Sequence, residues 1–481
     1  MSKKPINGLD RFFGVTERGS TMRTEILAGL TAFITLSYVL IMNPQILAAP
    51  YHPANTGVYP YADAVMYGRV YNGVFIATCI ASFLGTMLCA VYARVPYAQA
   101  PGMGLNTFFA YTVCLGLGYS YQQALVVVFI AGVLFILISL VGLRESIVNA
   151  IPPSVKNAIT PGIGLFITIL GLKNGGIVIA NASTLVGLVD FAHWQSSSGD
   201  FSTLAAPLLA LMGLALIGIL TAWKINGAVI ISIVVVTLLG IPLGVTPIQQ
   251  FTFDLEQQFK DFAQISLFKL DFAGLVDPGT QGTTQMVLTV IMLVVSFSLV
   301  NMFDSIGTLL GAARQADMID EDGNAIRMNE ALMADAVSTA ACAFIGTSTV
   351  STLVESASGI AAGGRTGLTS LVTSVLFLMA MLAAPLISLI PACATAPALI
   401  YVGVLMLANI KDVDFGHITD SIPAFCTIVF MPFTYSIANG VAMGLIFHCI
   451  LKTATGRFRE IHPLATLTAM IFLTRYAFMS M

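Results

Sequence analysis

Long apolar stretches alternate with short polar turns along most of the chain. Seven stretches precede residue 246 and seven follow residue 285, and most approach the roughly 20 residues that a helix needs to cross a bilayer. The pattern predicts an all-α polytopic membrane protein with fourteen transmembrane segments. The expected segments are 26–47, 74–91, 107–118, 124–143, 155–172, 203–222, 227–245, 286–310, 331–345, 348–359, 367–390, 392–408, 422–435 and 441–451.

Polar stretches divide the chain into five parts. Residues 1–25 contain five basic residues but no apolar stretch of the kind found in a signal peptide, so we expect a cytoplasmic N-terminal segment. Residues 26–245 and 286–455 form two halves with seven segments each, and an odd number inverts the second half relative to the first. Residues 246–285 are expected to connect the halves outside the cytoplasm as an amphipathic helix or folded loop. Residues 456–481 are expected to form a cytoplasmic tail.

Composition excludes several classes of protein. Hydrophobic residues make up 57% of the chain and charged residues 9%, whereas a soluble domain has about 25% charged residues. This excludes a soluble enzyme, a nucleic-acid-binding protein with a basic face and a disordered chain. The seven cysteines form no C-x-x-C pair and are interpreted as small core residues.

The basic residues orient the segments. With the N-terminus inside, 17 of the 21 Lys and Arg residues fall on the cytoplasmic side, as the positive-inside rule requires. The exceptions are Arg69, Lys173, Lys260 and Lys269. We therefore expect a multi-pass protein of the cell (inner or plasma) membrane, in contact with the lipid bilayer and with both termini in the cytoplasm.

Two segments differ from ordinary spans. Residues 94–106 are rich in Pro and Gly, and residues 346–364 begin with a β-favouring run of Ser, Thr and Val. Each predicts an extended piece followed by a half-helix, in the third and tenth segments. Such pairs of interrupted segments in corresponding halves point to the binding site of a transporter.

Acidic residues inside membrane spans are costly and are candidates for function. Asp304 and Glu355 stand out, because each lies within an apolar segment. They are suited to binding the N–H groups of a ligand and to exchanging protons. Asp335, near the start of the ninth segment, is expected to stay hydrated and to be structural.

Further candidates surround these two acids. Asn106 offers a donor and an acceptor at the start of a half-helix, where capping is an equally good interpretation. Phe108 and Phe303 are candidates to stack on a planar ligand, although packing is the commoner role of such rings. No catalytic, ATP-binding or metal-binding motif is present in the sequence, and no cofactor is predicted.

At these residues the sequence resembles the AzgA-like hypoxanthine/adenine/guanine permeases of the nucleobase:cation symporter 2 superfamily. The resemblance extends over nearly the whole chain in the family's order. The matching strings are Asn43-Pro-Gln-Ile-Leu, Pro101-Gly-Met-Gly-Leu-Asn-Thr-Phe-Phe-Ala, Asn174-Gly-Gly-Ile-Val, Phe303-Asp-Ser-Ile-Gly-Thr-Leu, and the run from Gly346 to Thr369.

The resemblance implies two inverted repeats divided into a core domain and a gate domain. It places the substrate between segments three, eight and ten, at Asn106, Asp304 and Glu355. It also implies that Gly104 lets a purine approach the backbone. Asn301 and Leu353 depart from the family pattern, which often has an acid and a tyrosine there. Asn301 is expected to share the cavity face with Asp304, one helical turn away.

The resemblance implies a secondary transporter that imports purine nucleobases (hypoxanthine, guanine or adenine) by proton symport. Sodium in place of the proton, and assembly as a homodimer, stay open. A uracil or xanthine carrier and an anion exchanger of the same fold are the alternatives, and two carboxylates facing the site disfavour the anion. An intramembrane enzyme or receptor would belong to a different class, and the sequence has no catalytic motif to support the enzyme.

Overall fold

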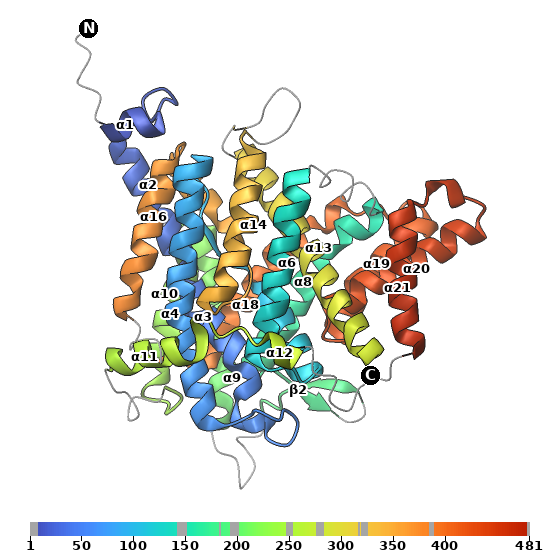
Figure 1. Ribbon diagram of the computed structural model, residues 1–481. Coiled ribbons are helices and arrows are strands. Elements are labelled where there is room, and N and C mark those ends of the chain that lie inside the picture. Colours follow the sequence, from blue (N-terminus) through green and yellow to red (C-terminus); the bar gives the residue numbers. More distant parts are fainter. Residues whose placement is uncertain are drawn as a thin grey trace.

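Helices form nearly all of the regular structure. The computed structural model describes residues 8–141, 152–181, 184–192, 202–246, 254–275, 283–315, 318, 326–383 and 389–478. Figure 1 shows the long helices standing side by side, with the short helices α11 (Leu255–Asp261) and α12 (Phe272–Leu275) at the end opposite to α1 (Gly8–Phe13).

The first predicted segment is split into α2 (Met22–Leu36) and α3 (Tyr38–Ala48). The hydroxyl of Ser37 donates to the carbonyl of Ile34 at 2.8 Å, a back-bond that bends helices. The other elements of this half are α4 (Ala64–Leu88), η3 (Cys89–Ala93), β1 (Gln99–Pro101), α5 (Met103–Thr107), η4 (Phe108–Gly116), α6 (Tyr121–Val141), α8 (Pro153–Asn174), β2 (Val178–Asn181), β3 (Leu185–Leu188), α9 (Ser202–Ala222) and α10 (Ala228–Gly240).

Helices also occupy the predicted segments of the second half. The helix α13 is the longest and holds both Asn301 and Asp304. The elements are α13 (Thr283–Gln315), α14 (Met328–Ile345), β4 (Val350–Thr352), η8 (Val354–Ser356), α15 (Ala357–Ala361), α16 (Gly367–Met379), η9 (Ala380–Ala383), α18 (Ala392–Leu407), η10 (Ala408–Asp412), α19 (Ile418–Phe433), α20 (Ile437–Ala454), η11 (Phe458–Glu460) and α21 (Pro463–Phe478).

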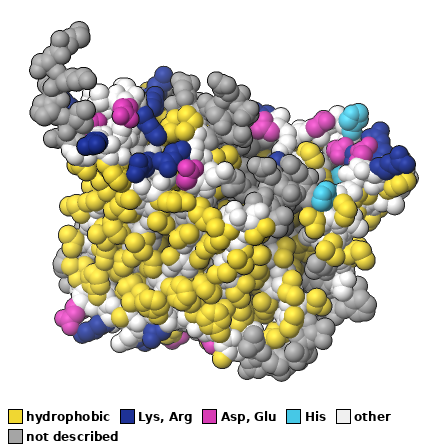
Figure 2. All heavy atoms as spheres, turned by 45° about the horizontal axis from the view of Figure 1, so that its top comes forward, with side chains coloured by type: hydrophobic (Ala, Val, Ile, Leu, Met, Phe, Trp, Pro, Cys, Tyr) yellow, Lys and Arg dark blue, Asp and Glu magenta, His cyan; other side chains and the backbone are white. Residues whose placement is uncertain are grey.

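Length and hydropathy mark these helices as membrane-spanning. In the described part of the chain, 7 helices are long and apolar enough to cross a bilayer, and several shorter apolar helices accompany them. Figure 2 shows a broad belt of hydrophobic side chains, with Lys and Arg gathered mainly along one edge of the belt. A lipid-facing surface is apolar in this way because the hydrocarbon core cannot solvate charge. The predicted polytopic membrane protein is therefore confirmed in its class.

Packing separates most of the helices into two groups. One group joins α2, α3, α4, α6, α14, α15 and α16, and the other joins α8, α9, α10, α18, α19 and α20. The long helix α13 packs mainly on the first group, against α6 and β4, and also reaches α8, α20 and α21. We call these the first and second helix groups.

The two groups meet at few places. Gln45 on α3 donates to the carbonyl of Ile390 at 3.1 Å and accepts from Thr395 on α18 at 2.6 Å. Thr112 on η4 donates to the carbonyl of Tyr435 at 2.8 Å. These contacts are few compared with those inside each group, so the groups are distinct packing units.

The two interrupted segments contain the predicted extended pieces. The strands β1 and β4 pair antiparallel, with Gln99 opposite Thr352 and Pro101 opposite Val350. Each strand leads into a short helix, α5 after β1 and η8 with α15 after β4. Both strands are fully buried, as non-helical backbone at membrane depth must be. The prediction of an extended piece followed by a half-helix is confirmed in both segments.

The polar connection between the halves packs on α4. Asp261 at the end of α11 is 1% exposed and accepts hydrogen bonds from Asn72 at 2.9 Å and from Arg69 at 3.5 Å. At the other end of the molecule, Arg18 donates to the carbonyls of Arg94 and Arg365, both at 3.1 Å. Of the amphipathic helix or folded loop expected in the connection, the structure has the short helix α11, which packs on α4 of the first helix group.

Candidate functional site

The pairing of β1 with β4 brings three segments together. A Cβ atom placed on Gly102, at the end of β1, would lie 3.3 Å from Oγ of Ser351 and 3.8 Å from Oδ2 of Asp304. Gly102 also donates its amide to the carbonyl of Thr349 at 3.2 Å. The predicted third, eighth and tenth segments therefore meet at Gly102. Because Gly102 has no side chain, the backbone after β1 lies close to the Asp304 carboxylate.

Glu355 lies directly after β4, in η8. Its Oε1 accepts a hydrogen bond from the hydroxyl of Tyr38 on α3 at 2.5 Å. Tyr38 is buried, whereas Glu355 is partly exposed. One oxygen of the carboxylate is thus bonded to the protein, and the residue is not completely enclosed.

Asp304 is the second carboxylate of the site. No described residue donates a hydrogen bond to it, and the residue is partly exposed. A partly buried carboxylate without a donor gains stability from any N–H group or proton brought to it. Asp304 is therefore suited to a ligand or a transported ion.

Asn106 on α5 is fully buried, and its amide has no hydrogen-bond partner within the described part of the chain. Its backbone N–H bonds to the carbonyl of Gly102 at 3.0 Å. The side chain does not cap the half-helix, because Gly102 holds the N-cap position. A buried amide with both of its polar atoms unpaired is costly, so a polar ligand is the natural partner.

Two predicted residues face other helices. Asn301 donates to Oγ1 of Thr339 on α14 at 3.1 Å, and its amide oxygen has no described partner. Phe108 is fully buried with its ring centroid 4.8 Å from that of Phe297. The side chain of Phe303 lies outside the described residues.

Gly104 lies against α8. A Cβ atom at this position would be 2.6 Å from Cγ2 of Ile163, closer than real side chains pack. The space beside Gly104 is therefore filled by a side chain of the second helix group. In this conformation the glycine allows α5 to approach α8, and it leaves no room there for a base.

Asp335 is not hydrated, contrary to the prediction from its place near the end of a segment. It is fully buried and accepts hydrogen bonds from the side chain of Gln99 and from the hydroxyl of Thr352, the latter at 2.9 Å. The prediction failed because α14 begins at Met328 and extends beyond the apolar stretch, which places Asp335 two turns inside the helix. Its structural role is supported by these bonds.

Like Asp335, Glu25 is fully buried. Its carboxylate accepts from the backbone N–H of Arg365 at 3.0 Å and from the hydroxyls of Thr366 and Thr369 at 2.9 and 2.6 Å. The Arg365 guanidinium donates to the carbonyls of Ile360 and Gly364. Arg365 thus binds the carbonyls at the end of α15 and forms no described ion pair with Glu355, so the site keeps its anionic character.

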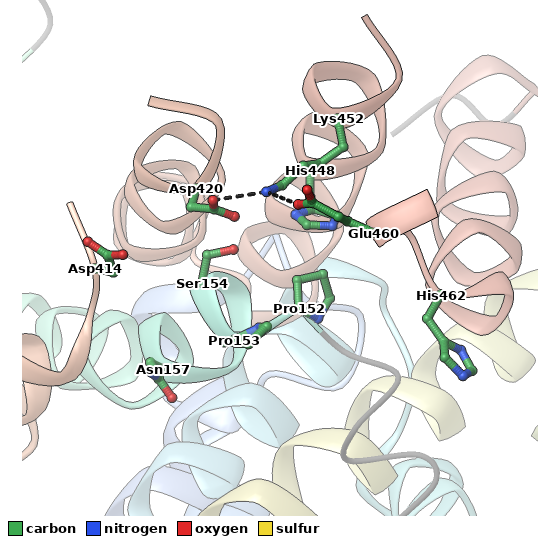
Figure 3. Close-up of a pocket in the computed structure, with 10 residues that line it drawn as sticks. All are labelled: Pro152, Pro153, Ser154, Asn157, Asp414, Asp420, His448, Lys452, Glu460 and His462. Atoms are coloured by element: carbon green, nitrogen blue, oxygen red, sulfur yellow. Dashed lines mark hydrogen bonds and ion pairs between the residues drawn. The ribbon is translucent and has the colours of Figure 1, made fainter. Parts of the chain in front are cut away.

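A separate cavity of about 360 Å³ lies among α8, α19, α20 and η11. Figure 3 shows Lys452 at one side of it, bonded to Asp420 and Glu460, with His448 alongside. None of its lining residues belongs to the predicted site. The lining residues are Pro152, Pro153, Ser154, Asn157, Asp414, Asp420, His448, Lys452, Glu460 and His462.

Sequence reasoning missed Tyr38 and Gln99. Tyr38 is one aromatic residue among many in apolar spans, and its partner is 317 residues away in the chain. Gln99 lies in an interrupted segment that was identified, but its bond to Asp335 depends on the strand register. Gln99 could have been identified because it is a polar residue inside an extended segment at membrane depth. No comparable feature of the sequence distinguishes Tyr38.

Comparison with known sequences places the chain. The sequence profile described as "Permease family" matches residues 23–443. The chain belongs to this Permease family. The adenine permease AdeP of Escherichia coli is 37% identical over 98% of this chain and 96% of its own length. The guanine/hypoxanthine permease PbuG of Bacillus subtilis is 38% identical over 97% of this chain and 99% of its own length.

The fold of this Permease family member is also seen in a solved structure. The transmembrane domain of the cyanobacterium bicarbonate transporter BicA matches with a TM-score of 0.54 and 19% identity, covering 87% of this chain and 97% of that one. The likeness shows a helical polytopic transporter fold. Because identity is so low, it says nothing of the substrate.

Proposed function

We propose that this chain imports purine nucleobases, with hypoxanthine, guanine and adenine as the candidate substrates, and that it does so by proton symport. The adenine permease AdeP and the guanine/hypoxanthine permease PbuG, to which the chain is similar, support the substrate class. The observation that carries the proposal is the group of polar side chains beside the paired strands. Asp304 and Glu355 are partly exposed, and the buried amide of Asn106 has no described hydrogen-bond partner.

Purines fit this set of atoms chemically. They are planar and neutral, with N–H donors and ring-nitrogen acceptors around the edge. Two carboxylates accept N–H groups, and the Asn106 amide both donates and accepts. An anion would meet two carboxylates without a described cation beside them, which disfavours an anion exchanger.

Fourteen spans in two inverted repeats are the topology that we infer. The seven long apolar helices account for part of the fourteen spans, and the shorter apolar helices and the two interrupted segments supply the others. Arg69 contacts Asp261. This contact supports placing the start of α4 and the connection between the two halves on the same, non-cytoplasmic side of the membrane. Arg18 bonds to the carbonyls of Arg94 and Arg365. These bonds support placing the N-terminal segment and the turns that contain Arg94 and Arg365 together on the cytoplasmic side of the membrane.

Transport follows from relative movement of the two helix groups. We infer that the first group is the core domain, because η8, which holds Glu355, packs on α2, and α5, which holds Asn106, packs on α3. Asp304 lies on α13, which packs mainly on the same group. The second group would form the gate. A base bound with a proton neutralises buried charge, which lowers the cost of moving the site past the gate.

Uptake of radiolabelled hypoxanthine into cells without their own purine carriers tests the function. We expect competition by purines rather than pyrimidines, stronger uptake at lower external pH and loss of uptake with a protonophore. Absence of purine uptake would refute the function. Sodium dependence without protonophore sensitivity would replace the proton as the coupling ion.

Site variants test the residues in the same assay. Asp304→Asn and Glu355→Gln should each reduce uptake by about 10-fold or more, since a hydrogen bond to a charged group is worth about 1.5–3 kcal/mol. The exposed pair Asp254→Asn and Glu256→Gln, on the connecting helix, is the matched control and should transport normally. Normal uptake by both site variants would refute the site.

A further inference from the structure

Tyr38 and Glu355 are joined by a hydrogen bond that the proposed function does not use. The phenol donates to Oε1 at 2.5 Å, and Tyr38 is 2% exposed. No other described side chain donates to Glu355. Within the described part of the chain, Oε1 is therefore engaged and Oε2 has no side-chain donor.

The helix α3 holds this tyrosine in place. Tyr38 is the first residue of α3, immediately after the break at Ser37, so its side chain is placed by the start of a new helix. The same helix packs on α4 and α5 and also reaches α18. Such packing restricts the ring, and the phenol is fixed relative to the carboxylate.

We propose that Tyr38 is a specificity-determining residue, because its hydroxyl already engages Oε1 of Glu355 and makes this oxygen a weaker acceptor for a second N–H group of the transported base. The inference rests on the proposed function and refines it. Tyr38 acts through Glu355 and is a positioning residue. With Oε1 engaged, a base that offers two parallel N–H groups gains little over a base that offers one.

Guanine and hypoxanthine separate these two cases. On one edge guanine presents the N1–H group and the 2-amino group side by side, which matches a carboxylate with both oxygens free. Hypoxanthine has the same ring and the same N1–H group, but it lacks the 2-amino group. The pair therefore isolates the second donor while size, charge and stacking stay nearly constant.

The test is the ratio of inhibition constants of unlabelled guanine and hypoxanthine against labelled hypoxanthine uptake. In Tyr38→Phe, Oε1 is free to accept the 2-amino group, so guanine should gain about 10-fold relative to hypoxanthine. Because both constants come from the same population of transporters, expression and folding losses cancel in the ratio.

Tyr97→Phe is the matched control. The Tyr97 hydroxyl is buried and has no hydrogen-bond partner among the described residues, so its removal should leave the ratio unchanged. An unchanged ratio in an active Tyr38→Phe would overturn the inference, and so would an equal change in Tyr97→Phe.

The wild-type protein provides a second measurement if Tyr38→Phe does not fold. The inference requires guanine and hypoxanthine to inhibit wild-type uptake within a few-fold of each other. A wild-type preference for guanine of about 10-fold or more would overturn it. Wild-type protein that takes up neither base would refute the proposed function itself, so the two failures are distinguishable.

Discussion

Gln99 of β1 lies opposite Thr352 of β4, and the carboxylate of Asp335 on α14 accepts a hydrogen bond from each of the two side chains. Asp335 also accepts from the backbone N–H of Thr352 at 3.3 Å. One buried acid thus connects both interrupted segments. Asn106 and Glu355 follow these strands by a few residues, so their positions depend on this connection.

Asp335→Ala should therefore displace Asn106 and Glu355, although Asp335 is not itself one of the proposed binding residues. The substitution leaves the N–H and hydroxyl of Thr352 buried without the acceptor, at a cost of about 1–3 kcal/mol each, and leaves the Gln99 amide nitrogen with only the weak Cys89 sulfur acceptor. We expect a lower thermal unfolding temperature in detergent and a strong loss of purine uptake per molecule at the membrane. Ser338→Ala removes the 2.7 Å bond to Gln99 and should have a smaller effect. Wild-type uptake by Asp335→Ala would contradict this role.

Local sequence signals predicted one part of this arrangement and not the other. Proline and glycine at residues 94–106, and β-favouring residues after Gly346, mark breaks wherever they occur, so the extended pieces were predictable. Their pairing joins residues about 250 positions apart and depends on packing of whole helices. The burial of Asp335 was missed because hydropathy locates a segment but not the depth of one residue in it.

Gly104→Ala should impair transport by steric contact with Ile163. The added methyl would lie 2.6 Å from Cγ2 of Ile163, and one of the two helices must move. We expect a reduced maximal uptake rate. Gly104→Ala combined with Ile163→Ala should recover much of it, because the smaller side chain makes room. Failure of this rescue would favour the role implied by the family resemblance, in which the glycine faces the purine.

Asn301→Asp should alter substrate preference if the amide oxygen faces the base. The amide donates to Thr339, and the free oxygen is the atom left for a ligand. A carboxylate adds negative charge and removes the donor, which should favour bases with more N–H groups. The ratio of inhibition constants for adenine and hypoxanthine measures the change. An unchanged ratio would show that Asn301 does not face the base and serves only in the contact with Thr339 on α14.

The role of the Gln45–Thr395 contact can be tested by cross-linking. Gln45 on α3 and Thr395 on α18 join the two helix groups, and separation of the groups must break this bond. In the Gln45→Cys, Thr395→Cys double variant, a short bifunctional thiol reagent should stop uptake, and reduction of a cleavable linker should restore it. Each single variant, treated identically, controls for the native cysteines. Continued transport by the cross-linked protein would show that these positions need not separate.

Glu460 gives the cavity in Figure 3 a predictable pH dependence. The hydrogen bond from Lys452, at 2.8 Å, lowers the pKa of Glu460. A lowered pKa means that the bond stabilises the folded state above the carboxyl's ordinary pKa of about 4.3 and that this contribution is lost as pH falls through the lower folded value. The contact of η11 with α20 should therefore be constant from neutral pH to about pH 5 and weaken in stronger acid.

Hydrogen exchange of the amides in η11 (Phe458–Glu460), corrected for intrinsic rates, measures this dependence. Glu460→Gln should show weaker protection at neutral pH and little further change in acid. Glu256→Gln removes the exposed ion pair with Lys260 and should leave η11 unaffected. Loss of protection centred between pH 6 and 7 would contradict the assignment, because a carboxyl with a lowered pKa does not titrate in that range.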